Sequence, residues 1–248
     1  MPHATTTPAA STTMRETLSR ARCVVLDLDG PVARVFAVDR AEFIARALLE
    51  IAEKDGCPIE DLRHCTDPIA VLYAYTVHME RMRGRDGWDR WDKVVAKMHD
   101  ALDAYEGKAA ESAVPTPGAA AFIRACRDSG RVLSVASNNH EDAATRILER
   151  MKVLDCFDGP IVGRPRDATL MKPHPHSLRK AMVLDFAVDR HLMIGDTGTD
   201  FQAAGTVGMP FYGYHRSDAG RARLGAAGVG PIATSMTDFH RAAEALDS

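Results

Sequence analysis

The pattern of apolar and polar positions predicts an alternation of strands and helices over most of the chain. A run of β-branched residues and leucine from Arg22 ends in Asp27 and Asp29 and is followed by the structure-breaking pair Gly30-Pro31, which indicates a buried strand opening into a loop. Further strands are predicted over 131–137, 161–162, 191–196, 210–214 and, weakly, 231–235. Helices are predicted over 117–128 (with Thr116 as the N-cap), 141–151, 176–186, 200–207 and 237–245. Such alternation is typical of an α/β fold with a doubly wound, mainly parallel sheet.

The segment between the first strand and Pro115 has helical periodicity and no strand pattern. One predicted helical face carries Phe43, Ala47 and Ile51, after a capping box formed by Asp39 and Glu42. A second predicted face carries Trp91, Val95, Met98, Leu102 and Tyr105. Because α/β connections usually span about 2 to 6 residues, we expect residues 36–112 to form an inserted helical domain. The core would then comprise 16–35 and 113–248, and residues 1–15, rich in Thr, Ala and Pro, would form a disordered tail.

Composition and charge narrow the classes of function. The chain has 248 residues, 46% of them hydrophobic, and a net charge of -3, so no global basic field would hold nucleic acid or an anionic membrane. The five cysteines lack a C-x-x-C pair, which argues against a disulfide framework or a zinc site. No apolar run approaches the roughly 20 residues of a membrane span, and the N-terminal residues do not form a signal peptide. We expect a soluble, cytoplasmic protein with a small-molecule partner, and the oligomeric state stays open.

Acidic side chains follow two of the predicted strands. Asp27 and Asp29 are two residues apart on an extended segment, so both carboxylates should leave the same face. Asp196 and Asp200 follow the strand over 191–196. Carboxyl ends of parallel strands lie side by side, and acids gathered there raise one another's pKa unless a cation neutralises them. Oxygen ligands in this number suit Mg²⁺, although a solvated loop or a helix N-cap at Asp200 would explain each motif alone.

Two other motifs present groups that can bind an anion. Ser137-Asn138-Asn139 ends the strand over 131–137 and opens the next helix, which exposes a hydroxyl and backbone N–H groups. Lys172 lies in the sequence MKPHP, where two prolines stiffen a loop that presents one cation. Each has an ordinary structural alternative, a helix cap in the first case and a solvated loop lysine in the second.

Taken together, these motifs resemble those of a known family. DLDG (27–30), SN (137–138), KPHP (172–175) and GDTGTD (195–200) match the four sequential motifs of haloacid-dehalogenase-like hydrolases, in the same order. The segment over 203–214 also resembles the family, and the helical insert resembles the cap of its phosphoglycolate-phosphatase-like members. The resemblance implies a Rossmann-like α/β core with an inserted α-helical cap. It also implies a Mg²⁺-dependent phosphatase that acts on a small phosphate ester.

The resemblance also implies roles for the carboxylates. Asp27 would attack phosphorus and carry the phosphoryl group as an aspartyl phosphate, and Asp29 would act as general acid and then as general base. Asp27, the backbone carbonyl of Asp29 and Asp196 would ligate Mg²⁺. Asp200 would be either a further ligand or an acid that orients one.

The same resemblance implies a phosphate-binding set formed by Gly30, Ser137, Asn138 and Lys172, with Lys172 also screening the nucleophile. Pro31 stands where the family most often has threonine, so we expect altered substrate handling. A phosphomutase or a dehalogenase on the same scaffold, or a non-catalytic binding module, are the alternatives. Asp29 together with Asp196 counts against a dehalogenase, which needs no metal. The presence of Asp27 and Lys172 counts against a non-catalytic module.

Overall fold

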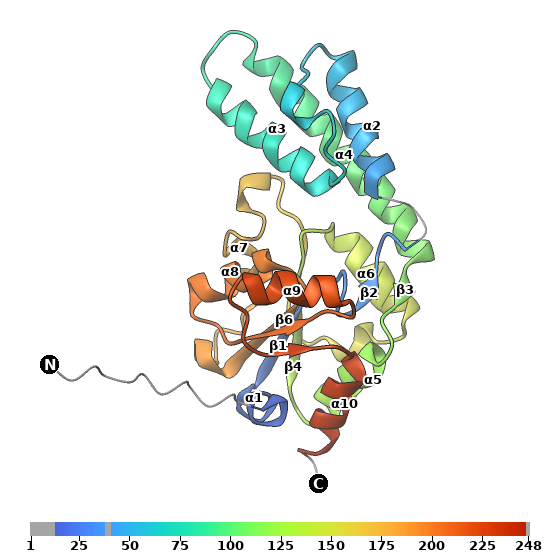
Figure 1. Cartoon of the computed structure of the whole chain (residues 1–248), viewed down its shortest axis with the longest axis vertical. Coiled ribbons are helices and arrows are strands. Elements are labelled where there is room, and N and C mark those ends of the chain that lie inside the picture. Colours follow the sequence, from blue (N-terminus) through green and yellow to red (C-terminus); the bar gives the residue numbers. More distant parts are fainter. Residues whose placement is uncertain (1–12, 38–40, 247–248) are drawn as a thin grey trace, which may run out of the picture.

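The computed structural model describes residues 13–37 and 41–246, which form an α/β core and a helical insert above it (Figure 1). Most of the expected N-terminal tail, residues 1–12, lies outside the described residues. Residues 14 and 15 were expected to belong to that tail but lie in helix α1 (Met14–Arg20), whose N-terminus is stabilised by a capping box between Thr13 and Glu16.

The core contains a six-stranded, entirely parallel sheet in the order β5-β4-β1-β6-β7-β8, which confirms the predicted fold class. Its strands are β1 (Cys23–Leu26), β4 (Val132–Ala136), β5 (Ile161–Val162), β6 (His191–Gly195), β7 (Phe211–Tyr214) and β8 (Ile232–Ala233). The chain moves from β1 to β4 on one side and later to β6 on the other side of β1. A reversal of this kind opens a crevice at the carboxyl ends of the strands, where doubly wound sheets bind their ligands.

Helices cover both faces of the sheet because the strands are apolar on both sides. Val24 and Leu26 of β1 pack in one core cluster, and Cys23 and Val25 pack in the other. The first face is covered by α1, α5 (Ala119–Asp128), α6 (Glu141–Arg150) and α10 (Met236–Glu244). The second face is covered by α7 (His176–Ala181) and α8 (Gly198–Val207). The core is therefore doubly wound, as predicted.

Some element boundaries differ from the predictions. Helix α7 ends at Ala181, five residues before the predicted end, and helix α9 (Asp218–Ala226) was not predicted. The expected N-cap at Thr116 is wrong, because α5 begins at Ala119 after Gly118, which has a positive φ of 88°. The Thr116 hydroxyl instead donates a hydrogen bond of 2.5 Å to the carbonyl of Gly30. It thereby links the end of the helical insert to the loop after β1.

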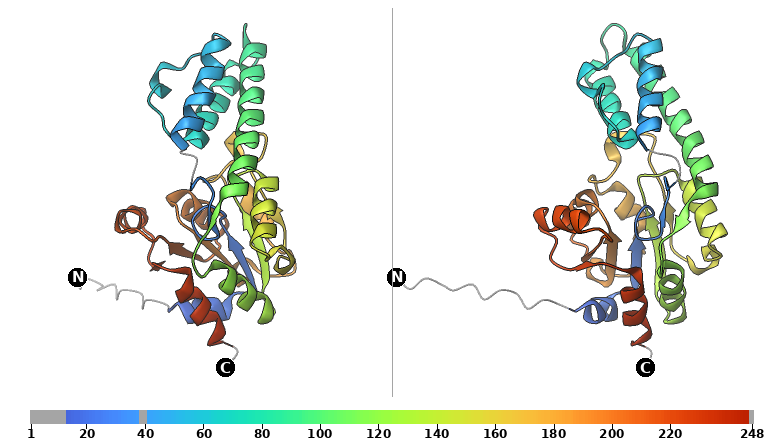
Figure 2. Two further views of the ribbon diagram at one scale, coloured as in Figure 1. Left: turned by 90° about the vertical axis from the view of Figure 1, so that its right-hand side faces the viewer. Right: turned by 45° about the vertical axis from the view of Figure 1, so that its right-hand side comes forward.

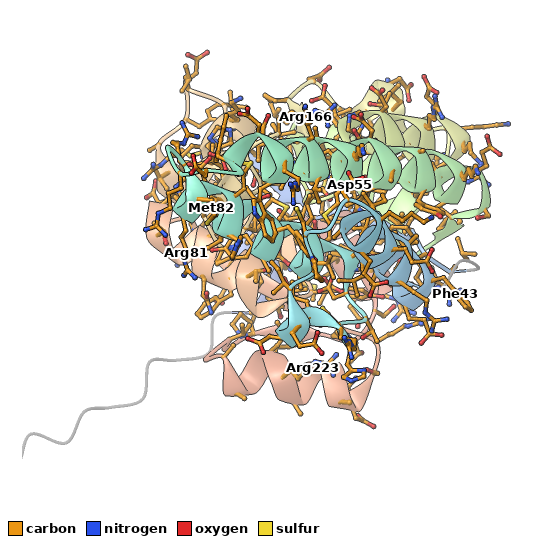
Figure 3. All side chains as sticks on the ribbon, turned by 90° about the horizontal axis from the view of Figure 1, so that it is seen from above. Phe43, Asp55, Arg81, Met82, Arg166 and Arg223 are labelled. Atoms are coloured by element: carbon orange, nitrogen blue, oxygen red, sulfur yellow. The ribbon has the colours of Figure 1, made fainter. Side chains whose placement is uncertain are left out.

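The helical insert consists of α2 (Ala41–Lys54), α3 (Pro68–Met82) and α4 (Trp88–Ser112), with a 3₁₀ turn at Glu60–Leu62. These helices form an apolar cluster distinct from those of the sheet, and Ala168 and Met171 of the core segment after β5 also belong to it. The predicted face of α2 is wrong, because Phe43 is 57% exposed at the edge of the insert (Figure 3), and Ile44 and Leu48 are buried instead. Both apolar stripes repeat every four residues, so this periodicity alone does not say which one is buried. The expected capping residue Asp39 lies outside the described residues.

Helix α4 is shared between the insert and the core, as its course alongside both parts shows (Figure 2). Val95, Met98 and Leu102 pack inside the insert as predicted, whereas Tyr105 is 36% exposed. Farther along the helix, Ala109 and Ala110 belong to the core cluster of the sheet. The core therefore includes the last turns of α4, which lie before residue 113.

The two crossings between core and insert lie side by side. Strand β2 (Ala33–Arg34) pairs antiparallel with β3 (Val114–Pro115), so that Ala33 faces Pro115 and Arg34 faces Val114. This short pairing was not predicted from the sequence. It places the start and the end of the insert next to the loop that follows β1. Among the described residues, the helices are too short or too polar to cross a bilayer.

Candidate active site

Three carboxylates meet at the carboxyl ends of the two central strands. Asp27 follows β1, and its backbone N–H donates to the carbonyl of Ile194 in β6 at 3.0 Å. Asp196 follows β6, and Asp200 lies in the first turn of α8. One oxygen from each of Asp27, Asp196 and Asp200 lies within 4.8 Å of the others. The strand ends therefore bring these acids together as predicted, and the cluster could hold a metal ion.

Asp200 is fixed by its own helix terminus. The N-cap of α8 is Thr197, whose hydroxyl accepts from the backbone N–H of Asp200 at 3.3 Å. In return, Oδ2 of Asp200 accepts from the Thr197 backbone N–H at 3.0 Å and from the Thr197 hydroxyl at 2.7 Å. This reciprocal capping box leaves Oδ1 directed at the ammonium of Lys172, 2.6 Å away.

Lys172 is buried among these carboxylates and is not a solvated loop lysine. The residue is 5% exposed, and its ammonium lies 2.8 Å from Oδ1 of Asp27 and 2.7 Å from the carbonyl oxygen of Ala136. Burial alone would lower the pKa of Lys172, but the carboxylates of Asp200 and Asp27 outweigh burial and raise it. The side chain therefore keeps its charge and joins the carboxyl ends of β1 and β4 to α8.

Asp27 and Asp196 have raised pKa values, mainly because their carboxyl groups are buried. Burial raises the pKa of Asp27 to about 7, an effect that Lys172 opposes and Asp200 reinforces. Burial also raises the pKa of Asp196 well above its usual value, together with the charges of Asp27 and Asp200. Three carboxylates around a single lysine form a donor set that fits a hard divalent cation. Asp27, Asp196 and Asp200 could therefore hold a metal ion, whereas Asp29, which was predicted to join them through its backbone carbonyl, is not part of this group of side chains.

Asp29 lies apart from this cluster but faces the same cavity. Its Oδ1 accepts a hydrogen bond of 3.0 Å from the backbone N–H of Val35, at the start of the helical insert. Burial raises the pKa of Asp29, and the N–H groups of Val35 and Gly30 partly oppose this. A buried carboxyl with a raised pKa keeps its proton to a higher pH than an exposed one, which suits proton transfer. The structure thus gives Asp27 and Asp29 different surroundings despite their shared face.

Only glycine suits position 30, because of the backbone conformation there and because Asp196 lies so close. Gly30 has a φ of 99°, and a Cβ atom there would lie 2.4 Å from Oδ2 of Asp196. Gly30 borders a smaller recess of about 190 Å³ on the other side of Asp29 and Asp196, not the main cavity. Any larger residue at position 30 would disrupt this close approach to Asp196.

The loop over 137–139 carries the remaining predicted residues. Ser137 is buried, and its hydroxyl oxygen accepts from the backbone N–H of Asn139 at 3.1 Å. The side-chain amide of Asn138 forms two bonds with the backbone of Lys172. Its Oδ1 accepts from the Lys172 N–H at 2.9 Å, and its Nδ2 donates to the Lys172 carbonyl at 3.2 Å. Asn138 therefore aligns the lysine loop with the end of β4.

A cavity of about 530 Å³ lies between the core and the helical insert. Its core side is formed by the carboxylates, the loop over 137–139 and Lys172. The insert closes it with the N-terminal turns of α3, including Ile69 and Tyr73, and Phe36 lines it from the first crossing. The predicted catalytic residues therefore line a half-open cavity that a small molecule can occupy.

Glu106 and Arg164, which lie near this site, were not predicted from the sequence, and Asn139, part of the motif over 137–139, was given no role of its own. Glu106 is completely buried and contacts the loop over 137–139 from helix α4. The sequence offered one signal, because Glu106 continues the helical spacing of the apolar residues Met98 and Leu102. A charged residue in an apolar stripe indicates a buried partner.

Comparison with known proteins assigns the chain to a family. The model of the family "Haloacid dehalogenase-like hydrolase" matches residues 24–214, which include β6, most of β1 and all four motifs. The chain belongs to this family. The assignment confirms the resemblance seen in the sequence. This haloacid dehalogenase-like hydrolase therefore has the family's core, together with a helical insert at the first strand.

Individual proteins with similar sequence or structure are consistent with this assignment. The hydrolase is 35% identical over 130 residues to a phosphoglycolate phosphatase from Rhodospirillum rubrum, a match that spans 50% of this chain and about half, 52%, of that relative. The fold resembles that of a predicted phosphatase from Clostridium acetobutylicum, with a TM-score of 0.62, 24% identity and 92% and 99% of the two chains covered. It also resembles a predicted phosphoglycolate phosphatase from Haemophilus somnus, with a TM-score of 0.60, 15% identity and 90% and 97% covered.

Proposed function

We propose that this hydrolase is a Mg²⁺-dependent phosphatase that hydrolyses a small phosphorylated metabolite through an aspartyl phosphate on Asp27. The observation that carries the proposal is the ammonium of Lys172, which lies 2.8 Å from Asp27 and 2.6 Å from Asp200 at the bottom of the cavity. This contact holds a carboxylate in place for attack and supplies positive charge where a phosphoryl group would bind. Positioning and charge neutralisation are the main requirements of phosphoryl transfer.

In the proposed reaction, a carboxylate oxygen of Asp27 attacks phosphorus and the bond from phosphorus to the ester oxygen breaks. The protonated carboxyl of Asp29 gives its proton to the departing oxygen, and its raised pKa suits this role. Asp29 then removes a proton from water, which attacks the phosphoryl group on Asp27. Orthophosphate leaves, Asp27 is free again, and Asp29 is protonated again. The covalent intermediate divides one displacement into two.

The metal would be held by Asp27, Asp196 and the backbone carbonyl of Asp29. Mg²⁺ in such a site neutralises negative charge on the carboxylates and on the phosphoryl oxygens. Asp200 would act either as a further ligand or by orienting Lys172, with which it pairs through Oδ1. Ser137, the backbone of Asn138 and Lys172 would surround the phosphate, whereas Gly30, which was predicted to join them, borders the smaller recess.

A metabolite-sized ester is the substrate class that fits the cavity. The space of about 530 Å³ is closed on the far side by helix α3 of the insert, which leaves room for a small leaving group. The similarity to a phosphoglycolate phosphatase makes a phosphorylated small acid the first compound to test. A phosphomutase would use the same core residues and differ in how the insert excludes water.

The experiment is a screen of purified protein with Mg²⁺ against phosphorylated metabolites and nitrophenyl phosphate, with released orthophosphate as the readout. We expect release from at least one ester, no release after exhaustive chelation and none with Asp27→Asn. A mutase would instead move phosphate between positions of a sugar phosphate and release little of it. Absence of release from every phosphosugar, phosphoglycolate and nucleotide would contradict the proposed function.

A further inference from the structure

The side chain of Glu106 binds the loop over 137–139 from helix α4. Glu106 is 0% exposed, and both of its carboxylate oxygens accept hydrogen bonds from this region. Oε1 accepts from the side-chain Nδ2 of Asn139 at 3.1 Å, and Oε2 accepts from the backbone N–H of His140 at 2.8 Å. A fully buried carboxylate with such partners is expensive to place in a core, so its location calls for a specific explanation.

Arg164 completes the contact from the other side of the loop. Its guanidinium lies 2.7 Å from Oε1 of Glu106, with side chains 1% and 0% exposed, and it also pairs with Asp103 of α4. The same guanidinium donates to the carbonyl of Asn138 at 3.2 Å, and the Arg164 backbone N–H donates to the carbonyl of Asn139 at 2.8 Å. Arg164 thus bonds two consecutive carbonyls of the loop.

The backbones around this contact approach one another closely. A Cβ atom on Gly163 would lie 2.3 Å from the backbone nitrogen of Glu141, so the segment before Arg164 lies directly against the start of α6. The loop over 137–139 is therefore enclosed between α4 and the segment after β5. Little room remains for it to shift without breaking these bonds.

We propose that Glu106 and Arg164, acting through Asn139, are positioning residues that hold the loop over 137–139 in the geometry needed to bind the transferring phosphoryl group. The inference rests on the proposed function, in which Ser137 and Asn138 bind that group. Two chains of contacts connect the cluster to the site. Asn139 bonds both to Glu106 and to the Ser137 hydroxyl. Asn138 bonds both to the guanidinium of Arg164 and to the backbone of Lys172.

Energetics favour a positioning role over a stabilising one. Replacing a buried ion pair with apolar residues of similar volume is often neutral or stabilising, so the pair adds little net stability. What an apolar pair could not supply is directional bonding to the Asn139 amide, the His140 N–H and the Asn138 carbonyl. The cluster therefore specifies the shape of the loop.

The test is Glu106→Gln, measured with an alkyl phosphate and with nitrophenyl phosphate. The glutamine has the same shape, but its NH₂ group must face either the His140 N–H or the Asn139 and Arg164 donors, so at least one contact is lost. A displacement of about 1 Å at a reacting centre can cost about 10²-fold, and we expect kcat/KM to fall about 10- to 100-fold. The loss should be equal for both esters, because the phosphoryl group is common to them.

Binding of orthophosphate to the Mg²⁺-loaded protein provides a readout that does not need turnover. We expect Glu106→Gln to weaken this binding by a comparable factor, measured by calorimetry. The matched control is Asp100→Asn, which removes an exposed ion pair of 2.9 Å between α4 and Arg166, a residue on the same segment as Arg164 (Figure 3). The control should stay within twofold of the wild type in both assays.

A double variant separates positioning from folding. Glu106→Gln combined with Arg164→Met removes both buried charges together, which avoids leaving one of them unpaired. We expect it to keep a cooperative thermal transition and to show the same loss of phosphate binding as the single variant.

Wild-type phosphate binding in a folded Glu106 variant would overturn the inference, as would a loss that only follows the folded fraction. If the wild type binds phosphate in a Glu106-dependent way but hydrolyses no ester, the proposed function fails and the positioning role stands. If the wild type binds no phosphate at all, both fail.

Discussion

Replacing Asp29 with asparagine tests the division of roles between the two carboxylates that follow β1. In the structure, Oδ1 of Asp29 accepts from the Val35 N–H at 3.0 Å, and an asparagine oxygen can accept the same bond. The variant should therefore preserve the loop and the start of the helical insert. A neutral hydrogen bond contributes about 1 kcal/mol, so even its complete loss would leave the fold intact. The asparagine side chain cannot, however, give a proton to the leaving group or take one from water.

The expected loss depends on the leaving group. General acid catalysis contributes about 10²- to 10⁴-fold, which corresponds to about 3 to 5 kcal/mol of barrier. An alkyl phosphate needs this proton, because its alkoxide is strongly basic, and formation of the phosphorylated enzyme should slow by that factor. Nitrophenyl phosphate releases a stable anion without help, so its first step should proceed. The second step should slow with both esters, because Asp29 also activates water.

The assay is rapid mixing of Asp29→Asn with nitrophenyl phosphate, together with mass measurement of the intact protein. We expect a burst of nitrophenol and an added phosphoryl mass that persists. Asp27→Asn is the matched control, and it should show neither burst nor added mass with any ester. Equal losses on both esters in the first step, without an accumulated intermediate, would refute the assignment of Asp29 as acid and base.

Three further predictions concern the metal, the helical insert and pH. Activity should require Mg²⁺ and should not be supported by Ca²⁺. Ca²⁺ prefers 6 to 8 oxygen ligands and should draw Asp27 out of line with the phosphorus atom that it attacks. Full turnover in the presence of a chelator would contradict this prediction. Removal of residues 41–102 should leave a folded core with residual activity on nitrophenyl phosphate. Removal of residues 41–112 should unfold the core, because it also takes Ala109 and Ala110 out of the core cluster. Circular dichroism would distinguish the two outcomes. Burial lowers the pKa of His99 to about 4, assisted by Arg164 and Arg166. The folded pKa lies below that of the unfolded chain, so up to about 3 kcal/mol of stability present above pH 6.5 should be lost as pH falls towards 4. Urea midpoints at both pH values should show a larger loss in the wild type than in His99→Gln by this amount, because the raised pKa values of Asp27 and Asp196 affect both proteins alike.

The strands and the motif order could be predicted because their signals are local. The apolar run that ends in Asp27 and the run before Asp196 each indicate a buried parallel strand, and parallel strands align their carboxyl ends. The sequence therefore predicts that these acids meet. It does not say that Lys172, 145 residues from Asp27, would lie within 2.8 Å of it, and this came only from the family resemblance.

The features that were missed depend on contacts between distant segments. Glu106 is 58 residues from Arg164, and nothing in the local pattern around either residue indicates their pairing. Thr116 followed by proline matches a helix N-cap, yet its hydroxyl bonds to Gly30, 86 residues earlier. For Phe43, two stripes of equal periodicity competed, and only the packing of α2 against α3 and α4 decides between them. In each case tertiary contact overrides a correct local rule.

The antiparallel pairing of β2 with β3 has a consequence for how such enzymes diversify. Because Arg34 faces Val114, the ends of the insert are already held together by the core. The entropy of closing a loop grows slowly, with each doubling of length costing only about 0.6 kcal/mol. The core can therefore tolerate inserts of very different size between these two points. A graft that keeps the last turns of α4, including Glu106, would change which molecules reach Asp27 without moving the groups that react with them.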